Sequence, residues 1–221
     1  MAVHTTRMLL LGAVAMFEPV NGYQIRRELV SWHVDEWANL GPGSIYSGLS
    51  TLEKLGQVVR HDLDDDGRTV AVYEITDAGR GELARLLGEG LETVTLFNAV
   101  AFNAAFGMLP LLAREVAIRH LEVRIEVLDR STEEWDPGAG ELAPPHAVHG
   151  VRHWLELLRE ERSWLVRTIE RLRAGDFDLA GEPWRWVPPT DDPGRQMQAD
   201  RERYRRMLAG LAAEGGSAPV S

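Results

Sequence analysis

The sequence predicts a mostly α-helical (α+β) chain whose N-terminal part combines short helices with one two-stranded ribbon. From Ser44 onward, apolar residues recur at helical spacing and define one inward face, namely Ile45, Leu49, Leu52 and Leu55. Next, Val58 to Leu63 alternates imperfectly, and Thr69 to Ile75 is rich in β-branched residues, with the turn Asp64–Gly67 between them. A short helix followed by a ribbon with a charged tip is the outline of a winged helix-turn-helix.

Two further helices are predicted upstream. Residues 5–17 are apolar on most sides, as is typical of a buried first helix. Pro19 ends this helix, and Asn21-Gly22 opens a second one that contains Tyr23, Ile25, Leu29 and Val30.

Helical patterns continue after the ribbon. Thr76 can cap a helix that starts at Asp77 and runs, with weak points at Gly88, Gly90 and Gly107, to Leu109. Pro110 suits the first turn of a further helix that reaches about Thr132. Residues 133–147 are expected to form a loop.

Residues 148–174 carry the longest regular pattern in the chain. Their apolar positions alternate spacings of four and three, which is a heptad seam with one arginine inside it: Val151, Leu155, Leu158, Arg162, Leu165, Ile169 and Leu172. This seam must bury its stripe against another helix. The partner is either residues 110–130 of the same chain or a second subunit.

The last part of the chain is predicted to be a linker and one more helix. Pro183–Pro189 is rich in proline and tryptophan and should be extended, and a helix at about 195–212 carries an apolar side. Gly215–Pro219 is typical of a disordered tail. The expected division is therefore a winged helix at 1–90, a helical dimerisation and effector domain at 91–175, and a linker, terminal helix and tail at 176–221.

The outward face of the helix at 44–55 has the composition of a DNA-reading surface. Ser44, Ser47, Gly48, Thr51 and Lys54 are small or polar, apart from one cation. A helix with short hydrogen-bonding side chains can approach base edges in the major groove, because bulky side chains would hold its backbone away.

Several short motifs in the first eighty residues resemble the PadR family of transcriptional regulators. They are Leu10-Leu11-Gly12, Asn21-Gly22-Tyr23-Gln24-Ile25, Pro42-Gly43-Ser44-Ile45-Tyr46, Leu49 with Leu52-Glu53-Lys54-Leu55-Gly56, and Tyr73-Glu74-Ile75-Thr76-Asp77-Ala78-Gly79. The resemblance implies a homodimeric winged-helix repressor that joins its subunits through the helical C-terminal domain. Two recognition helices related by a two-fold axis would read inverted half-sites about 34 Å apart.

The expected double-stranded DNA contacts come from the helix at 44–55, the wing at 57–75 and the second helix. The candidate residues are Tyr23, Arg26, Ser44, Tyr46, Ser47, Thr51, Lys54, Arg60, His61 and Arg68. The two tyrosines either pack the helix pair or reach phosphate, and the sequence leaves both alternatives open. The cations among these residues could form one basic stripe, which Arg27 would extend.

An effector site is also expected from the resemblance, because some PadR-like proteins bind flat aromatic compounds at the dimer interface. Phe97, Asn98 and Phe102 could line such a pocket near the dimer centre. Plain core packing is the alternative, since phenylalanines at near-helical spacing are typical of buried contacts.

Charge argues against DNA binding. The net charge is −10, and residues 1–90 hold eight Lys and Arg against thirteen Asp and Glu, with three carboxylates at the wing tip. Because affinity for DNA comes largely from neutralising phosphates, the second hypothesis is a sensing or protein-docking winged-helix dimer that does not bind DNA. Cysteine is absent, which fits a cytoplasmic location, and the apolar run Met8–Phe17 is too short to span a membrane.

No metal, cofactor or catalytic centre is expected. His146, His149 and His153 could share one helical face, and neutral imidazoles bind zinc or nickel. No acidic residue lies in the immediate run to orient the rings, so an exposed polar face is favoured. The chain carries no H-E-x-x-H, phosphate-binding loop or G-x-S-x-G pattern, and an enzyme is not expected.

Overall fold

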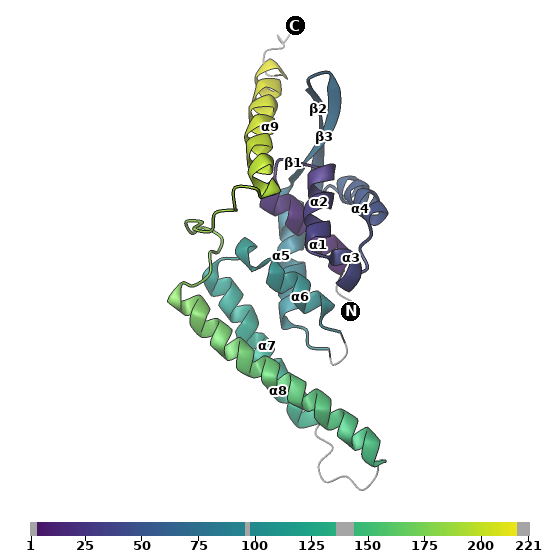
Figure 1. The fold of residues 1–221 in the computed structure, drawn as a ribbon, viewed down its shortest axis with the longest axis vertical. Helices are drawn as coiled ribbons and strands as arrows, with labels where there is room; N and C mark the ends of the chain where they lie inside the picture. The colour runs from purple at the N-terminus through teal and green to yellow at the C-terminus, as the bar shows by residue number, and fades with distance from the viewer. Residues whose placement is uncertain (1–3, 96–97, 136–143, 216–221) are drawn as a thin grey trace. The chain divides into compact units, whose positions relative to one another are not determined.

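The computed structural model describes residues 4–95, 98–135 and 144–215. Their helices and strands are, in chain order (Figure 1), α1 (Thr5–Phe17), β1 (Val20–Asn21), α2 (Gly22–Ser31), α3 (Val34–Trp37), α4 (Pro42–Lys54), β2 (Val58–Asp65), β3 (Arg68–Ile75), α5 (Asp77–Glu92), α6 (Val100–Gly107), the 3-10 turn η1 (Leu109–Leu111), α7 (Arg114–Glu134), α8 (Pro145–Ala174) and α9 (Pro193–Gly215). The mostly helical α+β class is confirmed. The chain forms two compact units, one with residues 4–85 and 186–215 and the other with residues 86–185.

The sheet of the first unit is antiparallel, with strand order β1-β3-β2. β2 and β3 pair without interruption from Val58 opposite Ile75 to Asp65 opposite Arg68. Asp66 and Gly67 both have positive φ, at 51° and 80°, as a two-residue hairpin turn requires. The two-residue strand β1 was not expected from sequence, because it is too short to show a pattern.

The core of this unit lies between α1, α2, α4 and the sheet. Residues 8–14 of α1 are all buried, as expected for a helix that is apolar on most sides. The other elements contribute Ile25, Leu29, Ile45, Leu49, Leu52, Val58 and Ile75, each at most 6% exposed. Three helices and a ribbon around one core confirm the predicted winged helix.

Side chains cap the starts of α2 and α5. Asn21 and Gln24 form a reciprocal capping box at the start of α2. The predicted cap at Thr76 is also present, since its Oγ1 accepts a hydrogen bond from the Gly79 amide at 3.0 Å. The same hydroxyl donates to the Gly56 carbonyl at 2.7 Å, which ties the start of α5 to the end of α4.

The prediction of one interrupted helix from 77 to 109 is wrong in its details. α5 runs through Gly88 and Gly90 and ends at Glu92, and α6 begins at Val100. At Gly88 a Cβ atom would lie 3.0 Å from the His120 ring, so close packing accounts for this glycine. Pro110 lies in η1, and the next helix begins only at Arg114, because the backbone of Leu112 is extended.

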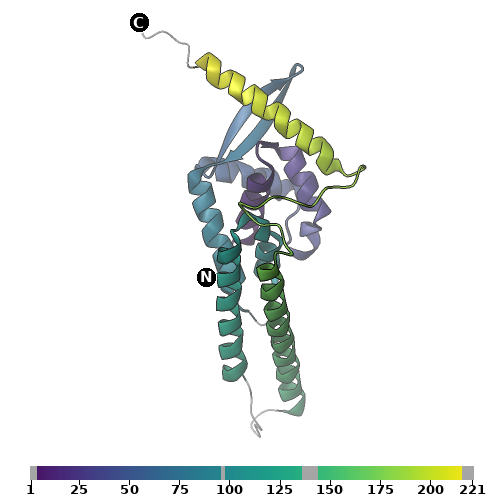
Figure 2. The same cartoon turned by 90° about the vertical axis from the view of Figure 1, so that its left-hand side faces the viewer.

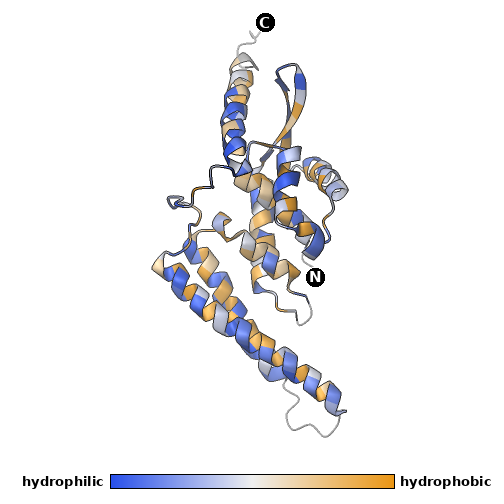
Figure 3. Ribbon diagram, viewed as in Figure 1, coloured by the Kyte–Doolittle hydropathy of each residue, from blue (hydrophilic) through white to orange (hydrophobic). Residues whose placement is uncertain are grey.

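The heptad seam is buried against α7 of the same chain, which is the intrachain alternative (Figures 1 and 2). The buried positions on α8 are Leu155, Leu158, Leu165, Thr168, Ile169 and Leu172. Arg162 lies at the edge of the seam, where it binds Asp129 of α7. Figure 3 shows polar and apolar residues alternating along α8, as this one-sided burial requires.

Residues 176–182 pack onto the start of α7 and belong to the second unit. Arg114 donates to the Phe177 carbonyl at 2.9 Å and forms an ion pair with Glu182 at 2.5 Å. The compact units thus divide after 85 and 185, whereas the sequence suggested 90 and 175. The Pro183–Pro189 segment is neither helix nor strand, as predicted, and the tail beyond Gly215 lies outside the described residues.

Acid is expected to weaken the first unit through Glu82. Arg85 and Arg7 donate to this carboxylate at 2.8–3.1 Å. These contacts, that of Arg85 above all, lower the pKa of Glu82 from about 4.5 to about 2. A pKa lowered by folding stabilises the folded state above the unfolded pKa, so this stabilisation is lost as the pH falls from about 4.5 to about 2.

Glu82→Gln should therefore lower the free energy of unfolding by about 1 kcal/mol at pH 7. The difference from wild type should shrink as the pH falls towards about 2, where the carboxyl begins to be protonated in the folded state as well. Urea unfolding at the two pH values measures this change. Glu160→Gln is the control, because its carboxylate is 74% exposed; an equal pH dependence in both variants would contradict the assignment to Glu82.

Candidate nucleic-acid interface

The outward face of α4 is the centre of the candidate interface. Pro42 occupies the first turn of the helix, and Ile45, Leu49 and Leu52 fix its inward face in the core. The remaining face consists of the exposed residues Ser44, Ser47, Ser50, Thr51 and Lys54. The predicted polar face is thus present, and Ser50 extends it. Ser50 was missed in the sequence, although it lies three residues after Ser47.

Gly48 is the exception to the predicted outward face. It is half-buried, and a Cβ atom there would lie 2.3 Å from Cδ1 of Leu10 on α1. The glycine therefore permits close approach of α4 and α1, and it does not belong to the exposed surface.

Two hydroxyls on this face donate to the backbone of their own helix. Ser47 Oγ lies 3.1 Å from the Ser44 carbonyl, and Thr51 Oγ1 lies 2.9 Å from the Ser47 carbonyl. A hydroxyl that donates in this way keeps its acceptor lone pairs. The face can consequently accept hydrogen bonds from the exocyclic amines of cytosine or adenine without rearrangement.

Tyr23 and Tyr46 lie near the α2–α4 junction and remain accessible. Tyr23 is 62% exposed and Tyr46 is 47% exposed. The ring of Tyr46 packs over Gly22, where a Cβ atom would lie 3.1 Å from its Cε1. Tyr46 therefore contributes to packing of the helix pair, whereas Tyr23 presents most of its surface to solvent.

The cations of this unit differ in their partners. Within the described part of the chain, no ion pair involves Arg26, Lys54 or Arg68, and the last two are exposed. Arg27, by contrast, binds Glu28 at 3.0 Å. The cations without a carboxylate partner are the ones best able to neutralise phosphate.

Two predicted wing contacts are paired within the ribbon. Arg60 binds Asp62 through two nitrogens at 2.7 and 2.9 Å, and this hydrogen bonding raises the pKa of Arg60. Nε2 of His61 lies 2.9 Å from a Glu74 oxygen. Because successive strand residues point to opposite faces, the structure does not bring Arg60 and His61 together.

The three wing-tip aspartates are partly accounted for by contacts within the first unit. Asp64 Oδ1 accepts a hydrogen bond from the Gly67 amide at 2.8 Å and so stabilises the turn. Asp65 forms an ion pair with Arg203 of α9 at 3.0 Å. The sequence signal for this pair is the basic stretch of residues 201–206, whose contact with the acidic tip was not predicted.

The candidate effector residues lie in the second unit. Phe102 is buried, Asn98 is exposed, and Phe97 lies outside the described residues. Phe102, Phe106 and Trp164 form an aromatic cluster with centroid distances of 4.9–6.3 Å. Trp164 is 37% exposed, so the cluster reaches the surface of this unit.

The described ranges hold neither a candidate metal site nor a membrane-spanning helix. There, no group of three or more His, Asp or Glu side chains could hold a metal ion, and the residues 146, 149 and 153 form no such group. In the same ranges, no helix is both long and apolar enough to cross a bilayer.

Comparison with known proteins places the first unit in a family context. Residues 10–85 match the model of the transcriptional regulator PadR-like family. No curated protein matches the chain. Among solved structures, Bacillus subtilis PadR in complex with operator DNA is similar, with 18% identity over 76% of this chain and 99% of that chain, and a TM-score of 0.33.

Proposed function

Because residues 10–85 are a domain of the PadR-like family of transcriptional regulators, a family without enzymatic activity, we propose that the protein is a cytoplasmic homodimeric repressor that binds an inverted-repeat operator. The observation that carries the proposal is the exposed polar face of α4 on a buried apolar base. Ser44, Ser47 and Thr51 contact base edges in the major groove. Lys54 contacts phosphate, and Tyr23 and Arg26 contact the flanking backbone from α2.

The wing has a smaller role in this proposal than the sequence suggested. Arg68 is its phosphate contact, because Arg60 and His61 already have carboxylate partners. In an acidic domain with only a few unpaired cations, the affinity for DNA depends on where those cations lie. Lys54 at the end of α4 and Arg68 at the wing tip mark the two ends of the candidate surface.

Homodimerisation is supported by apolar side chains left exposed on the helical unit. Leu157 and Trp164, which are seven residues apart and share one face of α8, are 54% and 37% exposed in the single chain. A second subunit that covers this side would bury the open edge of the aromatic cluster of Phe102, Phe106 and Trp164. A small flat aromatic effector binding there would change the angle between subunits and release the operator. Sedimentation equilibrium tests the homodimer, and tryptophan fluorescence tests binding of an aromatic compound beside Trp164.

Substitutions on α4 are expected to separate affinity from specificity. Lys54→Ala should weaken binding to all duplexes by about tenfold and reduce the salt dependence by about one counterion. Thr51→Ala should mainly reduce the preference for the operator over scrambled DNA. Fluorescence anisotropy of a labelled duplex from upstream of the protein's own gene, at low and moderate salt with scrambled competitor, measures both effects.

The control for these variants is Arg167→Ala, which removes an exposed cation from α8 and should leave DNA binding unchanged. Equal losses of affinity and preference in Lys54→Ala and Thr51→Ala would contradict the division of roles. Absence of salt-dependent binding by the wild type would overturn DNA binding itself. The net charge of −10 favours, in that event, a sensing or protein-docking dimer.

A further inference from the structure

α9 returns to the winged helix although more than a hundred residues separate them in the sequence. Its first half lies beside α2 and its second half crosses the β2–β3 ribbon (Figures 1 and 2). α9 thus contacts α2, β1 and the ribbon. The outward residues Ser44, Ser47, Ser50, Thr51 and Lys54 of α4 remain exposed.

The contact with the ribbon is a small hydrophobic core of its own. Tyr204 is 2% exposed and packs against Leu63 and Val72, which are 1% and 0% exposed. Val70, Met207 and Leu208 surround this cluster. Leu211, further along α9, is 53% exposed and lies outside the cluster.

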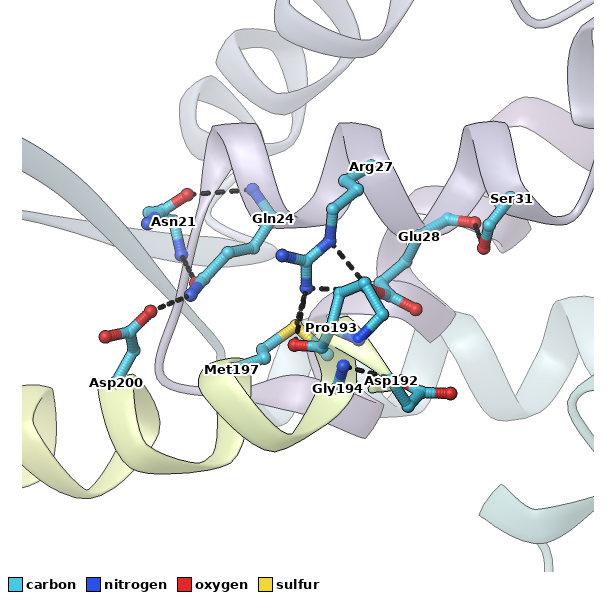
Figure 4. A network of polar contacts seen from close by, with 10 residues as sticks. All are labelled: Asn21, Gln24, Arg27, Glu28, Ser31, Asp192, Pro193, Gly194, Met197 and Asp200. Carbon is cyan, nitrogen blue, oxygen red and sulfur yellow. Dashed lines mark hydrogen bonds and ion pairs between the residues drawn. The ribbon is translucent and has the colours of Figure 1, made fainter. Parts of the chain in front are cut away.

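Polar contacts fix the other half of α9 on α2 (Figure 4). Gln24 Nε2 donates to Asp200 at 2.9 Å, and Arg27 donates to the Pro193 carbonyl at 3.3 Å. Asn21 Nδ2 donates to the Tyr204 hydroxyl at 2.9 Å. Asn21 and Gln24 also form the capping box of α2, so the same two side chains set the start of α2 and the position of α9.

An ion pair joins α9 to the wing tip. Arg203 lies 3.0 Å from Asp65, next to the hairpin turn, and 3.1 Å from Asp200 on its own helix. Tyr204 and Arg203 are neighbours, so one turn of α9 holds both the middle and the tip of the ribbon.

A ribbon of two strands is marginally stable on its own and needs a packed face. Val58 and Ile75 face the helical core of the unit, whereas Leu63 and Val72 point to the opposite face. Without α9, the latter two would be exposed to water along the free half of the wing. The wing would then sample several positions. Any phosphate contact from the wing would be weakened, because binding would carry the entropy cost of ordering the wing.

We propose that α9 is a brace that holds the wing in its DNA-binding position, and that Tyr204, Arg203 and Asp65 are positioning residues for the wing contact. This inference rests on the proposed function, since it assigns α9 a role in DNA binding. Asp65 serves as an internal counter-ion for Arg203, which explains why a carboxylate is present at the tip of a DNA-binding wing.

The test uses the full chain with Tyr204→Ala, Tyr204→Phe and the control Leu211→Ala. Amide hydrogen exchange measures how well the wing is ordered in the absence of DNA. Tyr204→Ala should accelerate exchange of β2 and β3 amides near the turn by about tenfold or more. Tyr204→Phe keeps the ring and loses the hydroxyl with its hydrogen bond to Asn21, so its effect should be smaller. Leu211→Ala should match the wild type, and unchanged wing exchange in Tyr204→Ala would overturn the brace.

A double-mutant cycle then links the brace to DNA. Tyr204→Ala should weaken operator binding by about tenfold, and adding Arg68→Ala should cost little more, because the wing contact is already lost. Adding Lys54→Ala should retain its full effect. If Arg68→Ala and Lys54→Ala each kept their full effect on operator affinity when added to Tyr204→Ala, Tyr204 would not act through the wing. A wild type that binds no duplex would overturn the proposed function and the role in DNA binding, while the exchange data would still decide whether α9 orders the wing.

Discussion

Gly79→Ala is expected to lower the free energy of unfolding of the N-terminal unit by about 3 kcal/mol. A Cβ atom at Gly79 would lie 1.9 Å from the Gln57 carbonyl oxygen and 2.8 Å from Cγ1 of Ile75. The first contact is with backbone, which cannot move aside as a flexible side chain could. The same Gln57 carbonyl accepts a hydrogen bond from the Thr76 amide at 3.1 Å, so a shift would break the junction between β3 and α5.

Gly81→Ala is the matched control two residues further along α5. Nothing lies within 4 Å of a Cβ atom at Gly81. Alanine should therefore stabilise the helix there by about 0.5–1 kcal/mol, because alanine loses less conformational freedom in a helix than glycine. Urea unfolding followed by circular dichroism measures both variants. A loss of similar size in the two would mean that close contact at Gly79 is not the cause.

Arg124→Met is expected to cost about 3–5 kcal/mol in the helical unit. Arg124 is 2% exposed, yet its guanidinium binds Glu161 of α8 at 2.5 Å and the carbonyls of Leu91 and Thr93 at 3.2 and 2.7 Å. It also stacks on the Phe102 ring at 3.9 Å. Methionine fills similar volume but donates no hydrogen bond, so the buried acceptors lose their partner.

Arg167→Met provides the comparison for this variant. Arg167 also pairs with a glutamate on α8, Glu160, but the two side chains are 58% and 74% exposed. Its loss should change the unfolding free energy by at most about 0.5 kcal/mol. Thermal unfolding monitored by tryptophan fluorescence distinguishes the two. If Arg124→Met were as mild as Arg167→Met, the buried network would not hold α5, α7 and α8 together.

The fold could be predicted from sequence wherever one element's own pattern decides it. The β-branched strands, the Thr76 cap, the α8 seam and the apolar face of α4 each depend on residues a few positions apart. Leu55, which was predicted on that face, is 51% exposed because the helix ends there. Interruptions were less predictable, because close packing around a glycine can offset the helix stability that the glycine costs. Gly88 lies against His120, so α5 continues through it.

In the candidate site too, features of a single element could be predicted, and features that depend on contacts between elements could not. The exposed residues of α4 follow from the period of a single helix and were predicted correctly as a surface. The state of the wing cations could not be predicted, because ion pairing depends on which carboxylate shares a face, as Asp62 does with Arg60. The apolar side of α9 was visible in the sequence, but such a pattern does not identify what it packs against.

The return of α9 to the winged helix has a consequence for biosynthesis. Residues 4–85 are translated well before α9, and at about 5–20 residues per second the delay is roughly 5–20 s. Throughout that interval the stripe of Leu63 and Val72 has no cover on the nascent chain. Transiently exposed strand surface of this kind promotes aggregation. The maturation of the N-terminal domain is thus timed by the emergence of α9 from the ribosome, and slow translation of the intervening region would prolong the vulnerable state.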